Sequence, residues 1–383
     1  MNTPYDYATS VSIVRSGSDY FDRCCQLIDQ ATQSIHLQTY IFTSDHTGQR
    51  IKKELIQAAR RGVKIFLLLD GFGSKDLEDQ DIADLKSNGI SIRFFSPLYK
   101  DRPFRIGRRL HHKLIVADDH KAIIGGMNIS DHYSGHNAEH PWLDYAVYLS
   151  GDVCKKITRI AMSLFNRRFR PVSVFHAVKN TNQGIAVRIR QSDYMRGKKE
   201  IPSSYKEFVQ LARNEILIVN AYFLPGYRMR RMLQRAVRNG VSIKVMLSAK
   251  SDVPVVKRAM NYYYQWLFRN KIAIYEYLPS NLHAKLAVFD HQYVTIGSFN
   301  LNYLSEYVSV ELNVDINDVA VARQFHAELD HIIETACHRV ERHVDRSKNP
   351  LSRMLDFISY QAVMYSMRVL YLLTRKDRIN YFR

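Results

Sequence analysis

Two segments of the chain show the same order of apolar and polar positions, and each predicts a strand, a helix and a second strand. Alternating positions indicate half-buried strands, and apolar residues at helical spacing indicate amphipathic helices. Gly62 and Gly240 each follow a predicted helix in the position of a C-terminal cap. Such units pair their strands in parallel and place helices on the faces of a sheet. The predicted elements span residues 34–42, 49–61 and 63–69 in the first segment and 215–223, 228–239 and 241–247 in the second.

Short apolar runs farther along predict one β-hairpin in each half of the chain. Asp118 and Asp290 open the turns, and Gly125 and Gly297 follow the return strands, where glycine allows a close approach of the backbone. We therefore expect an α/β fold of two repeats, each a mixed, largely parallel β-sheet flanked by helices. The hairpin strands are predicted at 114–117 with 122–124 and at 286–289 with 294–296.

A polar stretch with turn-forming residues at 179–184 separates the two repeats. We expect a first domain over residues 1–178, a second over 179–345 and a helical tail over 346–383. The 383 residues suffice for two domains of ordinary size, and the 46% of hydrophobic residues suffice for full cores. The first residues contain no long apolar run, so we expect neither a signal peptide nor an N-terminal membrane anchor.

The tail has apolar residues at steps of three and four among many basic ones. Asp356, Gln361 and Arg368 interrupt its longest apolar stretch, which argues against a spanning helix. An amphipathic helix lying on an anionic bilayer is the favoured interpretation. A helix packed on the second domain, or one at a dimer contact, is the alternative. The apolar positions are Leu351, Leu355, Ile358, Ala362, Tyr365, Val369 and Leu372.

The charge balance predicts an anionic partner. The formal net charge is +18 and the sequence pI is about 9.6, which suits nucleic acid, an acidic membrane surface or a phosphate-bearing substrate. A basic run at 100–109 precedes His111 and could contact head-group phosphates, with a solvated loop as the alternative; a second run covers 188–190. The cysteines have no zinc-ligand spacing and are expected to be free thiols in a reducing compartment. They are Cys24, Cys25, Cys154 and Cys337.

One polar motif occurs twice in the same register. Each copy contains a histidine, a lysine, an aspartate, a glycine and an asparagine, and one offset of 172 residues relates all five positions. Structural repetition preserves apolar spacing but does not require His, Lys and Asn to recur together. The motif residues are His111, Lys113, Asp118 and Asn128 in the first copy and His283, Lys285, Asp290 and Asn300 in the second.

The repeated side chains suit phosphoryl transfer. Histidine serves as nucleophile or proton donor near neutral pH. Lysine and asparagine beside it can hold phosphate oxygens and stabilise the charge of a five-coordinate transition state. Two such sets related by a pseudo-two-fold axis would place one histidine on each side of a phosphorus. The sequence shows no cluster of His, Asp and Glu that suggests a divalent metal, and we expect no metal and no cofactor.

The pattern His-x-Lys-x4-Asp-x6-Gly-(Gly/Ser)-x-Asn, present twice, resembles the signature of the phospholipase D superfamily. Over about residues 10–345 the chain is most similar to the bacterial cardiolipin synthases, in their shorter form without N-terminal membrane helices. The stretches that carry this similarity include 38–42, 69–74, 124–129, 220–225 and 282–285.

The resemblance implies synthesis of cardiolipin from two phosphatidylglycerol molecules. His111 would attack one phosphorus to form a phosphatidyl-histidine, and His283 would protonate the departing glycerol and then deprotonate the second substrate. The two lysines and two asparagines would hold the phosphate. Partners would be anionic phospholipid and a membrane surface, with the protein peripheral on the cytoplasmic side of the bacterial cell membrane.

Further residues are candidates for supporting the motif. His112 aligns with Ala284 and should point away from the site, while Asp118 and Asp290 are expected to hold their turns by hydrogen bonds. A carboxylate should orient each histidine. Glu311 is the candidate in the second repeat. In the first, Asp144 matches by strand pattern and Glu139 by residue count, and the pattern favours Asp144.

One motif position differs between the repeats, because Ser298 stands where the first has Gly126. A phosphate contact from the Ser298 hydroxyl would therefore have no counterpart in the first repeat. The superfamily also includes phospholipid hydrolases and nucleases, and both remain alternatives to the transferase. The apolar face of the tail has no use in binding nucleic acid, so a nucleic-acid partner is disfavoured.

Overall fold

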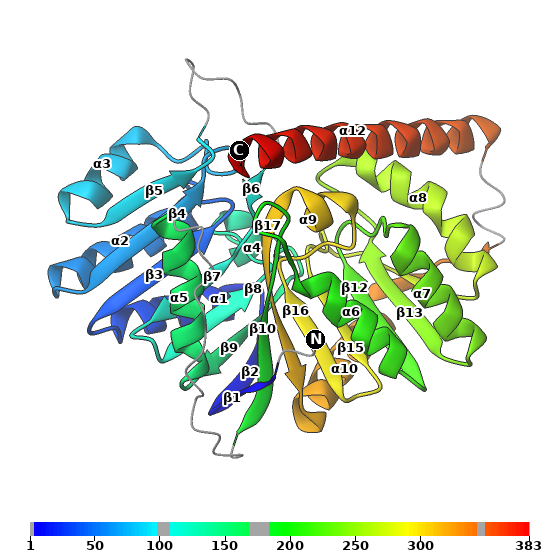
Figure 1. Ribbon diagram of the computed structural model, residues 1–383, viewed down its shortest axis with the longest axis horizontal. Helices are drawn as coiled ribbons and strands as arrows, with labels where there is room; N and C mark the ends of the chain where they lie inside the picture. The colour runs from blue at the N-terminus through cyan, green and yellow to red at the C-terminus, as the bar shows by residue number, and fades with distance from the viewer. Residues whose placement is uncertain (1–3, 98–107, 168–183, 343–348, 383) are drawn as a thin grey trace.

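The computed structural model describes residues 4–97, 108–167, 184–342 and 349–382. The predicted domain boundary at residue 179 and most of the basic run at 100–109 lie outside these residues. Two mixed β-sheets with flanking helices form the body of the molecule, and one long helix crosses its top edge (Figure 1). The α/β fold with two repeats is confirmed.

The first sheet has the strand order β2-β9-β8-β7-β3-β4-β5. β3 and β4 pair in parallel, as do β4 and β5, and the pairings from β2 through β9, β8 and β7 to β3 are antiparallel. The strands are β2 (Ser10–Arg15), β3 (Ser34–Thr39), β4 (Lys64–Asp70), β5 (Ser91–Phe95), β7 (Leu114–Ala117), β8 (Lys121–Gly125) and β9 (Tyr145–Ser150).

The second sheet repeats this arrangement. Its strands β17-β16-β15-β12-β13-β14 follow the order of β9-β8-β7-β3-β4-β5, and β1, β10 and β18 extend it at its two edges. The short strands β11 and β6 pair with β10 and β17. The bounds are β1 (Asp6–Ala8), β6 (Arg109–Leu110), β10 (Ile185–Asp193), β11 (Lys198–Lys199), β12 (Glu215–Asn220), β13 (Ser242–Ser248), β14 (Ala273–Tyr277), β15 (Lys285–Phe289), β16 (Tyr293–Gly297), β17 (Ser309–Asn317) and β18 (Cys337–Arg339).

Parallel pairing is less extensive than expected. The strand–helix–strand units pair in parallel, but each hairpin enters its sheet beside β3 or β12, and hairpin strands pair antiparallel. A further difference concerns β1, which belongs to the N-terminal residues but pairs with β10 of the second sheet. The first residues thereby fasten the two halves together.

Helices cover both outer faces, and a shared core joins the halves. α1 and α2 pack on the first sheet, while α6, α7 and α8 pack on the second. The inner faces of β8 and β9 meet those of β16 and β17, with α5 and α10 beside them. The bounds are α1 (Ser18–Asp29), α2 (His46–Arg60), α3 (Asp79–Ser87), α4 (Asp131–Ser134), α5 (Val153–Phe165), α6 (Glu200–Leu211), α7 (Tyr227–Arg238), α8 (Pro254–Arg269), α9 (Tyr303–Tyr307), α10 (Val319–Ala336) and α12 (Pro350–Phe382).

The glycines predicted to end two helices do so. Gly62 and Gly240 follow α2 and α7 with φ of +92° and +90°, the left-handed conformation that glycine adopts without strain. The basic run at 188–190 lies inside β10. Arg188 and Arg190 are buried there and pair with Asp315. Two buried guanidinium groups thus neutralise a buried carboxylate.

The tail forms one helix, α12, which packs along α8 and α9 of the second half. This agrees with the alternative interpretation, a helix packed on the second domain. Val363 and Met367 enter the core of the second half, and Tyr371 packs edge-on against Tyr303 and Tyr307. No helix within the described ranges is long and apolar enough to cross a membrane. The outward face nevertheless keeps large apolar side chains exposed, namely those of Leu351, Met354, Leu355, Phe357, Ile358, Tyr365, Val369, Leu372 and Leu373.

Candidate active site

Both copies of the repeated motif open into one cavity of about 680 Å³ between the two halves. His111 and Asn128 line it from the first half, and His283 and Asn300 line it from the second. Its remaining wall is largely apolar and includes Met367 and Leu370 of α12. The tertiary structure therefore joins the two motifs into a single site beneath the C-terminal helix.

The segment carrying His111 docks on the second half of the molecule. β6 pairs in parallel with the start of β17, and the backbone N–H of His111 donates to the carbonyl oxygen of Val310 at 2.9 Å. The next residue, Glu311, places a carboxylate oxygen 2.8 Å from Nδ1 of His111. The carbonyl oxygen of Ser298 lies 3.0 Å from the same nitrogen. With Nδ1 as donor to these oxygens, the unprotonated Nε2 is left for chemistry.

His283 is held by the reciprocal arrangement. Its backbone N–H donates to the carbonyl oxygen of Leu143 at 2.8 Å, and the next residue, Asp144, places a carboxylate oxygen 2.7 Å from its Nδ1. Both carboxylates predicted to orient a histidine contact one, but each contacts the histidine of the other repeat. Glu139, which matched by residue count, is almost fully exposed and 3.8 Å from His140.

Burial keeps both imidazoles neutral in the free enzyme. It lowers the pKa of His111, and the carboxylate of Glu311 offsets part of that effect. For His283, burial and the Lys285 ammonium together lower the pKa to about 4, against the opposing carboxylate of Asp144. A neutral imidazole at pH 7 is the form that can act as nucleophile or base.

The two lysines occupy equivalent places beside the histidines. Nζ of Lys113 donates to the backbone carbonyl of His111 at 3.0 Å, and Nζ of Lys285 donates to that of His283 and lies 2.8 Å from its Nδ1. Both side chains are buried. Burial holds the pKa of Lys113 well below its usual range and lowers that of Lys285 to about 8. Each ammonium lies beside its histidine, although neither lysine is among the residues that line the cavity.

The asparagines differ in how they are held. The side-chain oxygen of Asn128 accepts from the N–H of Ile41 at 3.2 Å, and its amide donates to the hydroxyl of Tyr133 at 2.8 Å. Oδ1 of Asn300 is buried with no hydrogen-bond partner among the described residues. A buried oxygen without a hydrogen bond is energetically costly, so we expect Oδ1 of Asn300 to accept a hydrogen bond from a ligand.

The difference between Gly126 and Ser298 follows from the different lengths of the neighbouring carboxylate side chains, Asp144 and Glu311. A Cβ at Gly126 would lie 2.4 Å from an oxygen of Asp144, so only glycine fits beside this shorter side chain. Ser298 donates its hydroxyl to Glu311 at 2.5 Å and accepts from the N–H of Leu312 at 3.0 Å. The serine hydroxyl thus positions Glu311, and the phosphate contact considered for it stays untested.

Asp118 and Asp290 lie at the opposite ends of β7 and β15 from the motif histidines. Asp118 accepts from the backbone N–H groups of residues 32, 33 and 34 at 2.8, 2.8 and 2.9 Å. Asp290 accepts from those of residues 213, 214 and 215 at 2.5, 2.8 and 2.8 Å. These bonds fasten the turn to the start of the central strand, so the two residues are anchors of the hairpin.

Residues outside the two motifs surround the site. His112 is fully buried, with Nδ1 3.0 Å from Oε1 of Gln38, in agreement with a packing role. Asp70 and Ser248 close β4 and β13 and accept from the N–H of Leu110 and Leu282 at 2.8 Å, which steadies each histidine segment. Tyr40, Tyr133, Trp142, Tyr222 and Asp252 line the cavity. Tyr40 and Tyr222 hold equivalent places after β3 and β12.

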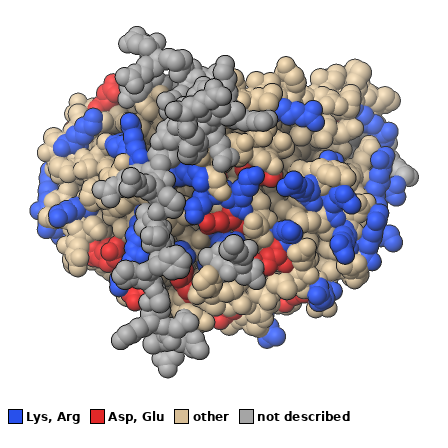
Figure 2. Space-filling model, in the orientation of Figure 1, with Lys and Arg blue, Asp and Glu red and all other residues tan. Residues whose placement is uncertain are grey.

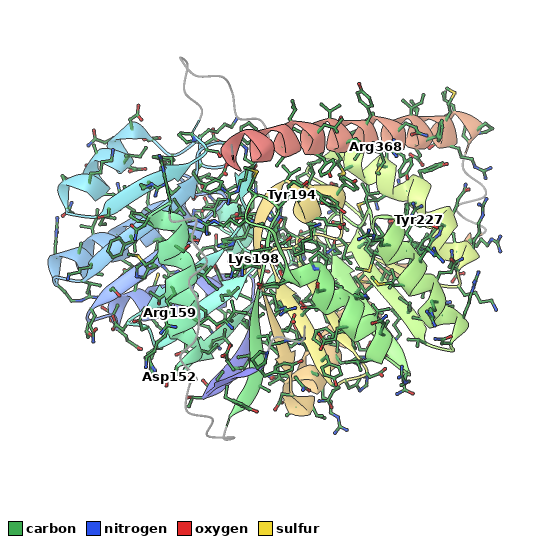
Figure 3. The ribbon with its side chains drawn as sticks, in the orientation of Figure 1. Asp152, Arg159, Tyr194, Lys198, Tyr227 and Arg368 are labelled. Carbon is green, nitrogen blue, oxygen red and sulfur yellow. The ribbon has the colours of Figure 1, made fainter. Side chains whose placement is uncertain are left out.

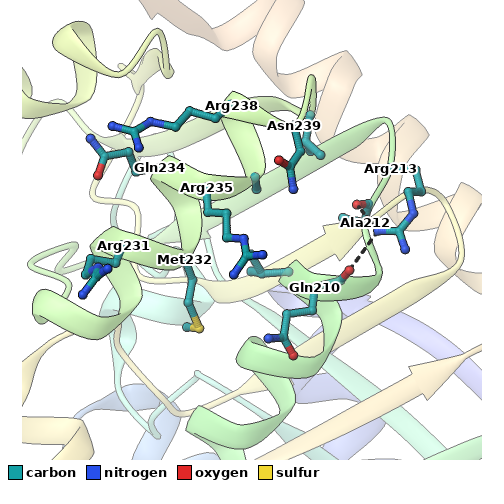
Figure 4. Close-up of a pocket in the computed structure, with 12 residues that line it drawn as sticks. Gln210, Ala212, Arg213, Arg231, Met232, Gln234, Arg235, Arg238 and Asn239 are labelled. Atoms are coloured by element: carbon teal, nitrogen blue, oxygen red, sulfur yellow. Dashed lines mark hydrogen bonds between the residues drawn. The ribbon is translucent and has the colours of Figure 1, made fainter.

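A second cavity lies between α6 and α7 and is lined by arginines (Figure 4). Arg213, Arg231, Arg235 and Arg238 surround about 660 Å³, and no motif residue takes part. Lysine and arginine side chains also dominate the neighbouring surface in the view of Figure 2. This cavity adds to the positive potential of the second half, but it lacks a group for acid, base or nucleophilic chemistry.

Comparison with known proteins agrees with the repeated architecture. A family model described as "Cardiolipin synthase, PLD-like domain" matches residues 24–164 and 205–333. Cardiolipin synthase B of Escherichia coli (strain K12) is 32% identical over 355 residues, which cover 89% of this chain and 84% of that protein. A cardiolipin synthase of Oceanobacillus iheyensis is 28% identical over 366 residues, covering 92% and 76%.

The fold is also that of solved structures. The phosphatidylserine synthase of Haemophilus influenzae Rd KW20 superposes with a TM-score of 0.76 at 13% identity, over 97% of each chain. The matching of one domain model twice, together with relatives above 30% identity, shows that this chain belongs to the cardiolipin synthase family of the phospholipase D superfamily.

Proposed function

We propose that this protein joins two phosphatidylglycerol molecules into cardiolipin and releases glycerol, through a phosphatidyl-histidine at His111. The observation that carries the proposal is the pair of crossed contacts in one cavity, Glu311 with His111 and Asp144 with His283. Each carboxylate engages Nδ1 of its histidine, so both Nε2 atoms are available to a phosphodiester between them.

The first step transfers the phosphatidyl group to the enzyme. Nε2 of His111 attacks the phosphorus, a P–N bond forms, and the P–O bond to glycerol breaks. Nε2 of His283 gives a proton to the departing glycerol oxygen. Burial lowers the pKa of free His283 to about 4, and a bound phosphodiester anion favours the protonated form. Lys113 and Lys285 stabilise the negative charge on the phosphate oxygens.

The second step reverses the roles. The glycerol hydroxyl of a second phosphatidylglycerol loses its proton to Nε2 of His283 and attacks the phosphorus. The P–N bond to His111 breaks, and His111 is neutral again. The largely apolar wall formed with Met367 and Leu370 accommodates acyl chains and limits water, which supports an alcohol rather than water as acceptor.

The test combines product analysis with trapping of the intermediate. Purified enzyme is incubated in chelator with phosphatidylglycerol vesicles and, separately, with single-stranded DNA, and protein quenched during turnover is analysed by mass spectrometry. Cardiolipin with glycerol, and an adduct on His111 that is absent from His111→Ala, support the proposal. Phosphatidic acid as the main product, cut DNA, or an adduct at His283 alone would each reject it as stated.

We further propose that the outward face of α12 rests in an anionic bilayer. Leu351, Ile358 and Leu372 are exposed there, and exposed Arg368 lies on the same helix along the top of the molecule (Figure 3). Met367 and Leu370 of α12 also line the active cavity, so the helix proposed to rest in the bilayer is part of the cavity wall. All four cysteines are free, which suits the reducing cytoplasmic side of the membrane.

Deleting the tail is a poor test of membrane docking, since Val363 and Met367 belong to the core. Replacing Leu351, Ile358 and Leu372 by serine removes only exposed apolar surface. We expect this triple variant to lose most of its sedimentation with phosphatidylglycerol liposomes, while Leu278→Ser, at another exposed site, keeps it. Equal sedimentation of both proteins would exclude α12 as the docking surface.

A further inference from the structure

A cluster of potential metal ligands lies at the end of the second sheet farthest from the catalytic cavity. Glu215 is the first residue of β12, His291 stands in the turn between β15 and β16, and His326 lies on α10. Their ligand atoms all lie within 4.8 Å of one another. Asn220, at the other end of β12, pairs with Lys285 of the active site, so the two places are roughly 17 Å apart along the strand.

The cluster is preorganised by its neighbours. Oδ2 of Asp330 lies 2.9 Å from Nδ1 of His326, and this contact aims Nε2 of the buried His326 at Oε2 of Glu215, 2.7 Å away. Metal-binding histidines characteristically donate their second ring nitrogen to a carboxylate in this way. Lys244 contacts the other oxygen of Glu215 at 2.8 Å and leaves Oε2 facing the histidines.

His291 completes the set from a constrained turn. Its φ of 52° is left-handed, and the adjoining Asp290 binds the N–H groups of residues 213–215, which fixes this turn against the start of β12. Nε2 of His291 lies 3.7 Å from Oε2 of Glu215, and its ring centre lies 3.9 Å from that of His326. The side chain is 45% exposed, so it can turn toward a common centre.

We propose that Glu215, His291 and His326 bind a divalent transition-metal ion of the zinc type, with the fourth position taken by water. Two imidazoles and one carboxylate form a ligand set that suits zinc, with bonds of about 2 Å and ligand atoms roughly 3.3 Å apart in tetrahedral geometry. The ion would tie together β12, the β15–β16 turn and α10. The first repeat has Ser34 and Asp119 in place of Glu215 and His291, so the site belongs to the second half alone.

The test measures metal binding by the full-length protein after chelator treatment. Zinc is titrated by calorimetry, cobalt(II) is followed by its visible absorption, and the melting temperature is recorded with and without zinc. The wild type should bind one equivalent and melt higher with zinc. His291→Ala, which removes a half-exposed side chain, should abolish both effects, and Asp330→Asn should weaken affinity about 10- to 100-fold.

His331→Ala is the matched control, because His331 is an exposed histidine on the same helix. It should bind zinc as the wild type does. Binding in His291→Ala and His326→Ala equal to that in the wild type, or no zinc binding by the wild type at micromolar concentrations, would overturn the proposal. If His326→Ala fails to fold because His326 is buried, His291→Ala, which removes a half-exposed side chain, still tests the proposal.

Discussion

A carboxylate oxygen of Glu311 lies 2.8 Å from Nδ1 of His111, although the two residues belong to different repeats. Asp144 and His283 form the reciprocal pair at 2.7 Å. Neither half therefore contains a complete catalytic group, since each provides a histidine and the carboxylate for the histidine of the other. The shared core and the exchanged strands β1 and β6 hold the halves in the register that this exchange requires.

Replacing Glu311 by glutamine should impair His111 through its position and tautomer. We expect kcat to fall about 10²- to 10⁴-fold, as for a lost carboxylate in a hydrolase triad, with a small change in KM for lipid. The rate of adduct formation on His111 and its pH profile are the measurements. Glu139→Gln alters an exposed carboxylate and serves as control. An unchanged adduct rate in Glu311→Gln would show that this contact has no positioning role.

A methyl group at position 126 should displace Asp144 from His283. The added Cβ would lie 2.4 Å from a carboxylate oxygen, and a shift of about 1 Å in a catalytic group can cost 10²-fold in rate. We therefore expect Gly126→Ala to lose about 10²-fold in kcat with normal far-UV circular dichroism. Ser298→Ala adds no atom and should retain more activity. The reverse ranking would contradict the explanation given for the difference between Gly126 and Ser298.

Activity should decline at alkaline pH because Lys285 loses its charge. Burial lowers the pKa of this ammonium to about 8, so kcat/KM, which reports the free enzyme, should fall as pH rises through about 8. In Lys285→Arg the guanidinium stays charged, and this decline should move to higher pH even if the maximum is lower. A decline at the same pH in both proteins would assign it to another group.

Asp118 and Asp290 should matter for stability more than for chemistry. Each carboxylate holds three backbone N–H groups, and unsatisfied donors cost about 1 to 3 kcal/mol in total. Asp118→Ala is expected to lower the free energy of unfolding by this amount, measured by urea denaturation. Its specific activity at low temperature should stay within about threefold of the wild type. A loss of activity without a loss of stability would place Asp118 in the catalytic machinery.

Acid should destabilise the fold partly through His36. This side chain is buried and stacks on Phe66, and burial lowers its pKa from 6.5 to about 4. The unfolded chain then binds more protons below pH 6.5, so stability falls as pH decreases toward 4. His36→Phe keeps an aromatic ring there and should reduce the loss between pH 7 and pH 5 by about 1 to 2 kcal/mol, measured by denaturant unfolding. An equal loss in both proteins would assign the effect to other groups.

Much of the fold could be predicted because its signals are local. The central strands, the helices before Gly62 and Gly240 and both hairpins depend on the order of apolar residues and on turn chemistry. The extent of antiparallel pairing was underestimated, because it depends on where each hairpin enters its sheet. The burial of Arg188 and Arg190 could not be predicted locally, since their partner Asp315 lies far away in the sequence.

The sequence by itself determined the two His-x-Lys motifs, their common register and the candidate carboxylates Asp144 and Glu311, because residue types and spacing are written in the chain. Only the tertiary structure decided which carboxylate meets which histidine, that α12 forms part of the cavity wall, and that Glu215, His291 and His326 come together. These contacts join residues distant in sequence. Tertiary packing, rather than any local preference, brings such residues close together.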